Sequence, residues 1–165
     1  MTYNKRIGLL CLTLAFAVVS ISLWIFGNSL KNGEESDKDS SRVIERVKPV
    51  IDPKNKISHD VFNFTVRKTA HFTEYCFLGM CSTALTGAIF LKKQKKYYLL
   101  PFMFTLFNAA FDEIIQSQTG RTSSIVDVLI DFCGAIFGIA LFTAAAWLIK
   151  AAFNRKKRRR SSKTL

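Results

Sequence analysis

Four residues in one short segment, Arg67, Lys68, His71 and Glu74, carry the side chains of an ion-binding or acid–base site. Arg67, His71 and Glu74 are spaced i, i+4 and i+7, so on a helix they form one stripe. An imidazole titrates near neutral pH, and a nearby carboxylate can orient it, which suits general acid–base catalysis. The segment predicts His71 and Glu74 as candidate catalytic residues, with Arg67 and Lys68 as cations for an anionic ligand.

More carboxylates follow at helical spacing towards the C-terminus. Asp112 and Gln116 are spaced i, i+4, and so are Asp127 and Asp131, which puts each pair on one helix face. Carboxylate oxygens with a histidine suit Mg²⁺ or Mn²⁺, so a divalent cation such as Mg²⁺ is a candidate cofactor, and the sequence does not decide whether one is bound. The predicted ligand-binding residues are Arg67, Lys68, Asp112, Glu113, Gln116, Arg121, Asp127 and Asp131.

Long uncharged stretches must position these residues. The 20 residues from Ile7 to Phe26 carry no charge, and as a helix they cover about 30 Å, the thickness of the hydrocarbon core of a bilayer. Three further apolar runs are long enough to cross only if they take in some of the acids above. We therefore predict an all-α, polytopic membrane protein with four transmembrane helices, at residues 7–26, 71–91, 97–116 and 125–149. Helices in a soluble bundle would carry a polar face, which these lack.

The lysines and arginines predict the orientation. The N-terminal tail, the "KKQKK" connection and the C-terminal tail together hold 14 of the 24 positive residues, whereas seven acids dilute the cations of the long first loop, residues 27–70. Since cytoplasmic loops carry the positive excess, both termini of this multi-pass cell-membrane protein are expected in the cytoplasm. The candidate site residues then all converge at the outer ends of the helices, where a shared outward-facing pocket is expected.

The first loop itself has two parts. Its residues between Lys31 and Ser41 are rich in Ser, Asp and Glu, which predicts a mobile linker. Valines at helical spacing follow and predict a short amphipathic helix on the bilayer surface, ended by Pro49 and Pro53.

The basic tail, residues 150–165, contains the run "RKKRRR". Directly after a membrane span, this run is explained by topology and by attraction to anionic lipid heads rather than by nucleic acid. The expected partner is therefore the lipid bilayer, the oligomeric state stays open, and residues 1–165 are expected to form a single membrane domain.

The segments "RKTAHFTEYCFLG" and "FDEIIQSQTGRTSSIVDVLIDFCGAIFG" resemble the VanZ-like family of bacterial membrane proteins. Sequences of that family carry R-K-x-x-H-F-x-E-Y, D-E-x-x-Q, an arginine in the following turn, and D-x-x-x-D-x-x-G. The matching positions here are Arg67, Lys68, His71, Phe72, Glu74, Tyr75, Asp112, Glu113, Gln116, Arg121, Asp127, Asp131 and Gly134. The resemblance implies a small polytopic protein of the cell membrane, in a family whose founding member is linked to reduced sensitivity to the glycopeptide teicoplanin. It implies no mechanism.

The residues and the resemblance leave several functions open. One is a non-catalytic envelope protein that lowers sensitivity to glycopeptide or lipoglycopeptide antibiotics, its pocket binding an envelope lipid, a wall precursor or the drug. Another is a metal-assisted membrane enzyme acting on an envelope lipid or wall precursor. A third is a proton-coupled transporter. The polar groups could also serve only to bond one another and hold the helix ends together.

Overall fold

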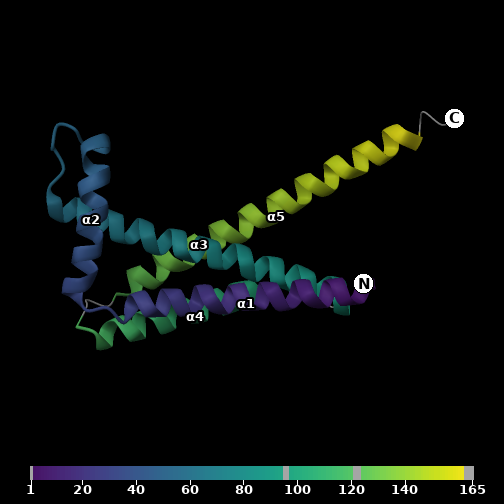
Figure 1. Ribbon diagram of the computed structural model, residues 1–165, viewed down its shortest axis with the longest axis horizontal. Helices are drawn as coiled ribbons and strands as arrows, with labels where there is room; N and C mark the ends of the chain where they lie inside the picture. The colour runs from purple at the N-terminus through teal and green to yellow at the C-terminus, as the bar shows by residue number, and fades with distance from the viewer. Residues whose placement is uncertain (1, 95–96, 121–123, 162–165) are drawn as a thin grey trace.

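The computed structural model describes residues 2–94, 97–120 and 124–161, with side chains as far as residue 156. These residues form five helices and no strand: α1 (Tyr3–Ser29), α2 (Gly33–Ile51), α3 (His59–Lys93), α4 (Leu100–Gln118) and α5 (Ile125–Ser161). Figure 1 shows α1, α4 and the C-terminal part of α3 running side by side, with α2 standing across the N-terminal part of α3. Helix α5 crosses α3 and continues away from the other helices (Figure 1).

Three of the described helices are long and apolar enough to cross a membrane. They are α1, α3 and the part of α5 from Ile125 to Lys156. Helix α4 has 19 residues, which reach about 28 Å, but it carries Asp112 and Glu113 in its second half. The all-α fold with several membrane helices is thus confirmed, whereas α4 as a fourth span stays a prediction.

The linker predicted between Lys31 and Ser41 is wrong, because α2 begins at Gly33. Its N-terminus is capped by Asn32, whose side-chain oxygen accepts a hydrogen bond from the Glu35 amide at 2.9 Å. Glu34 and Glu35 lie in the first turn, where the helix dipole favours negative charge. These local signals, together with packing against α3, outweigh the polar composition.

Pro49 does not end α2, which runs on to Ile51. The predicted amphipathic character is confirmed in part: Ile44 is buried and Glu45 and Arg46 beside it are exposed, but the valines Val43 and Val50 are exposed as well. The helix therefore covers α3 instead of forming part of a loose loop.

The membrane helices also extend beyond their predicted bounds. Helix α3 begins at His59 rather than near 71, with Ser58 as its N-cap, and its 35 residues reach about 52 Å, well beyond the roughly 30 Å core of a bilayer. Helix α5 continues past residue 149 to Ser161, so the first part of the basic tail is helical. Apolar composition marks only the stretch that can lie in lipid, whereas the helical backbone continues beyond this stretch.

Three glycines bring α3 and α5 into backbone contact. A Cβ atom on Gly138 would lie 2.0 Å from the carbonyl oxygen of Cys76, and one on Gly134 would lie 2.4 Å from that of Phe72. In the other direction, a Cβ on Gly79 would lie 2.3 Å from the carbonyl oxygen of Ala135. No larger residue fits these three places without moving a helix. Gly134 and Gly138 are the two ends of the segment "GAIFG", a small-xxx-small pattern that predicts close packing with another helix, and this prediction is confirmed.

Candidate functional site

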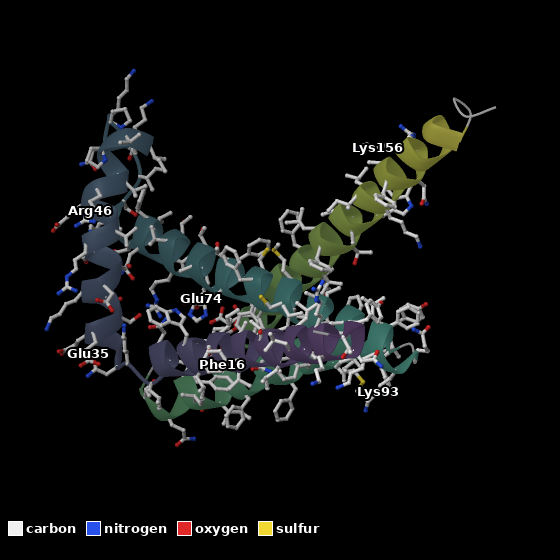
Figure 2. All side chains as sticks on the ribbon, turned by 45° about the vertical axis from the view of Figure 1, so that its right-hand side comes forward. Phe16, Glu35, Arg46, Glu74, Lys93 and Lys156 are labelled. Atoms are coloured by element: carbon white, nitrogen blue, oxygen red, sulfur yellow. The ribbon has the colours of Figure 1, made fainter. Side chains whose placement is uncertain are left out.

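The polar side chains of the bundle gather where α1 and α4 end, where α5 begins and where the first half of α3 passes between them. Glu74, labelled in Figure 2, marks this place on α3 next to the end of α1. Because the α3–α5 crossing brings Phe72 against Gly134, the neighbouring residues His71 and Asp131 are also brought together. We call this region the polar end of the bundle.

At its centre lie His71 of α3, Asp112 of α4 and Asp131 of α5, which we call the His–Asp–Asp cluster. The Nδ1 atom of His71 is 3.8 Å from Oδ2 of Asp112 and 3.8 Å from Oδ1 of Asp131. One ligand atom from each residue lies within 4.8 Å of the other two. The side chains are only 15%, 0% and 3% exposed in that order. Three separate helices thus place two carboxylates and one imidazole around one buried point.

Gln116 holds Asp112 in place. Its side-chain nitrogen donates a hydrogen bond to Oδ2 of Asp112 at 2.9 Å and approaches the hydroxyl oxygen of Ser29 at 3.3 Å. The hydroxyl of Thr119 donates to the backbone carbonyl of Ser29 at 3.4 Å. The end of α1 is therefore tied to α4 directly beside the cluster.

Two further acids of the polar end secure the start of α5. Glu113 accepts a hydrogen bond from the backbone N–H of Ser124, which immediately precedes α5. Asp127 forms an ion pair with Lys68 of α3, with both side chains largely buried. Glu113 and Asp127 are thus bonded to Ser124 and Lys68. Asp131 is the acid of α5 that faces His71.

Glu74 is held by α1. Its Oε1 atom accepts hydrogen bonds from Asn28 Nδ2 at 2.9 Å and from Trp24 Nε1 at 3.2 Å. Arg67 lies two turns earlier on the same face of α3, and its Nη1 atom is 3.4 Å from Oδ1 of Asp37 on α2. The stripe predicted on α3 thus meets all four of the other helices along its length.

A pocket of about 280 Å³ opens between α1, α2 and α3 beside the cluster. Its polar lining includes Trp24, Lys31, Arg67, His71 and Glu74, and we call it the α1–α3 pocket. Across it, Lys31 Nζ lies 2.7 Å from Oδ2 of Asp39 on α2. The hydrogen bond and charge of Lys31 hold the pKa of the Asp39 carboxyl below its usual value. His71 belongs both to this pocket and to the buried cluster, so it connects the two.

The structure brings most of the predicted site residues to one end of the bundle, but in separate groups. His71, Asp112 and Asp131 lie together, and Gln116 donates a hydrogen bond to Asp112. Arg67 and Glu74 line the pocket. Lys68 pairs with Asp127, and Glu113 contacts the start of α5. Arg121 lies outside the described residues. The catalytic and binding roles of these residues stay predictions.

Sequence reasoning missed the residues that α1 and α2 contribute. Trp24, Asn28, Lys31 and Asp39 line the pocket or bond to Glu74, and Ser29 contacts Gln116. The signal available was the polar pair Asn28–Ser29 directly after an apolar helix. The part played by α2 had no such signal, since it depends on that segment folding back over α3.

Comparison with known proteins identifies the family of the chain. No curated protein and no solved structure gives a significant match to the chain. The model of the VanZ/LLP1 family matches residues 11–149, which include α1 from Cys11 onward, all of α2, α3 and α4, and the polar end of the bundle. The chain therefore belongs to the VanZ/LLP1 family.

Proposed function

We propose that this VanZ/LLP1-family membrane protein binds the anionic head group of an envelope lipid or of a lipid-linked wall precursor in its α1–α3 pocket. The observation that supports this most is the composition of the pocket, in which Lys31 and Arg67 stand beside the indole of Trp24. Arginine and lysine recognise phosphate oxygens, and an indole suits the boundary between lipid and water.

The size of the pocket favours a lipid head group over an antibiotic. A volume of about 280 Å³ is close to the lower end of ligand pockets in proteins, about 300 Å³. A phosphate or diphosphate group fits such a space, whereas a whole glycopeptide is several times larger. In this proposal a lowered sensitivity to glycopeptides arises because the protein occupies the lipid or precursor, not because it sequesters the drug.

The charge distribution supports an outward-facing pocket. The connection after α3 and the tail after α5 carry the positive excess, which favours the cytoplasm, whereas the pocket lies along the N-terminal half of α3. Lipid-linked wall precursors present their head groups on that outer side when they are used.

Native mass spectrometry of the full chain tests this function, with phosphatidylglycerol and undecaprenyl phosphate as anionic probes and phosphatidylcholine as the neutral one. We expect the wild type to retain the anionic probes, and Arg67→Gln and Lys31→Gln to retain them about tenfold less well. Arg46→Gln is the matched control, because Arg46 is an exposed arginine of α2 outside the pocket lining (Figure 2). Equal retention in all four proteins would rule the proposal out.

A further inference from the structure

We infer that His71, Asp112 and Asp131 hold one divalent cation of the Mn²⁺ and Mg²⁺ class at the inner side of the α1–α3 pocket. The site takes one nitrogen and two carboxylate ligands, each from a different helix. Its existence does not depend on the proposed function. Only the role of the cation toward a phosphate-bearing head group rests on the proposed function.

The distances favour a shared ion over direct hydrogen bonding. The two separations of 3.8 Å between His71 Nδ1 and the aspartate oxygens exceed the roughly 2.7–3.2 Å of a hydrogen bond. Ligand atoms that each lie about 2.1 Å from one octahedral metal are about 3.0 Å apart when adjacent and about 4.2 Å apart when opposite. The two His71–aspartate separations fall between these values and all three ligand atoms lie within 4.8 Å of one another, so a modest inward movement of the side chains would complete the coordination.

The charges in the cluster are compatible with a bound cation. Asp112 and Asp131 are almost completely buried, and two ionised carboxylates that close repel each other strongly in a medium of low dielectric constant. A divalent ion neutralises both carboxylates and binds neutral imidazole.

Two buried oxygen atoms on residues that adjoin the cluster support the presence of a hydrated ion there. The hydroxyl of Tyr75, one turn after His71 on α3, is completely buried and has no hydrogen-bond partner in the described part of the chain. The same holds for Oε2 of Glu113, which adjoins Asp112. Both side chains lie within electrostatic reach of Asp131. Buried polar atoms are nearly always satisfied in proteins, and water molecules bound to a cation would satisfy these.

The donor chemistry selects the metal class. Two carboxylates with open positions for water suit Mg²⁺ and Mn²⁺, and the single imidazole shifts preference towards Mn²⁺. Because His71 also lines the α1–α3 pocket, the cation would stand next to a bound phosphate group and could share its charge. The site is thus placed to act on the same ligand that Lys31 and Arg67 recognise.

Titration of the purified full chain with Mn²⁺ alone, followed by electron paramagnetic resonance, tests the inference. We expect about one Mn²⁺ per chain, displaced by excess Mg²⁺, and at least tenfold weaker binding by Asp131→Asn. Asp60→Asn is the control: it makes the same chemical change at an exposed aspartate in the first turn of α3, away from the cluster. Its affinity for Mn²⁺ should equal that of the wild type.

A second measurement identifies the nitrogen ligand in the wild type itself, so that its result does not depend on whether the variants fold. Electron spin echo modulation should show nitrogen coupling to bound Mn²⁺, and His71→Gln should abolish it. Absence of Mn²⁺ binding, bound Mn²⁺ without nitrogen coupling, or equal loss in the two aspartate variants would each overturn the site. No lipid is present in these experiments, so their failure is distinct from failure of the head-group binding test.

Discussion

Gly138 of α5 faces the backbone of α3 so closely that a Cβ atom added to it would lie 2.0 Å from the carbonyl oxygen of Cys76. One turn earlier, Gly134 makes the same kind of contact with Phe72. This crossing determines how far apart His71 and Asp131 lie, since these residues flank it on the two helices. The close approach of two helices is therefore the basis of the candidate site.

Replacing Gly138 with alanine should separate the two helices. We expect Gly138→Ala to lower the free energy of unfolding by about 1–3 kcal/mol through overpacking, measured by denaturant titration of the protein in detergent. Gly87→Ala on α3 is the control, because no atom lies within 4 Å of a Cβ placed there and the gain in helix propensity is the same. Equal stability of the two variants would contradict the close crossing.

The ion pair between Lys68 and Asp127 should contribute to stability. Its side chains are only 22% and 17% exposed, so water screens it weakly. A double-mutant cycle with Lys68→Met and Asp127→Asn should give a coupling energy of about 1–2 kcal/mol. The exposed pair of Arg42 and Asp39 on α2 should show almost no coupling in the same experiment. Similar coupling energies in both pairs would show that burial does not strengthen the ion pair between Lys68 and Asp127.

Helix α4 is expected to cross the membrane. Single cysteines at Glu45, Gln94 and Gln118 test this in a chain whose native cysteines are replaced by alanine. A membrane-impermeant maleimide should label Glu45→Cys and Gln118→Cys in intact cells, and Gln94→Cys only after lysis, because Gln94 precedes α4 and Gln118 ends it. Labelling of Gln118→Cys only after lysis, as for Gln94→Cys, would mean that α4 does not span.

The turn between α2 and α3 should open at low pH. The carboxylate of Asp52 accepts hydrogen bonds from the backbone N–H groups of Ile57 at 2.7 Å and Lys56 at 3.0 Å, which lower the pKa of Asp52 below its usual value. A lowered folded-state pKa stabilises the turn above the unfolded-state pKa of about 3.9, and this stabilisation is lost as the pH falls through the folded-state pKa.

Amide hydrogen exchange, corrected for intrinsic rates, measures this effect at Lys56 and Ile57. Protection should be constant near neutral pH and fall below about pH 4. Asp52→Ala should show low protection at every pH, since it has no carboxylate to lose. Protection in the wild type that persists unchanged through the acid range would refute the role of Asp52.

The sequence alone determined the class of the molecule and much of its candidate site. Runs without charge, helical periodicity and motif spacing are local properties, so they indicated a helical membrane protein and assigned His71, Asp112 and Asp131 to the ends of three helices that would meet. The glycine pattern also predicted which face of α5 packs.

Only the tertiary structure decided how these residues are grouped. It showed that Asp127 pairs with Lys68 while Asp131 faces His71, and that α2 folds over α3 to form one wall of the α1–α3 pocket. A helix face seen in sequence spans several neighbouring side chains, and which of them meets a partner depends on the angle and distance of the crossing. Those quantities arise from packing between segments far apart in the chain, which local spacing does not contain.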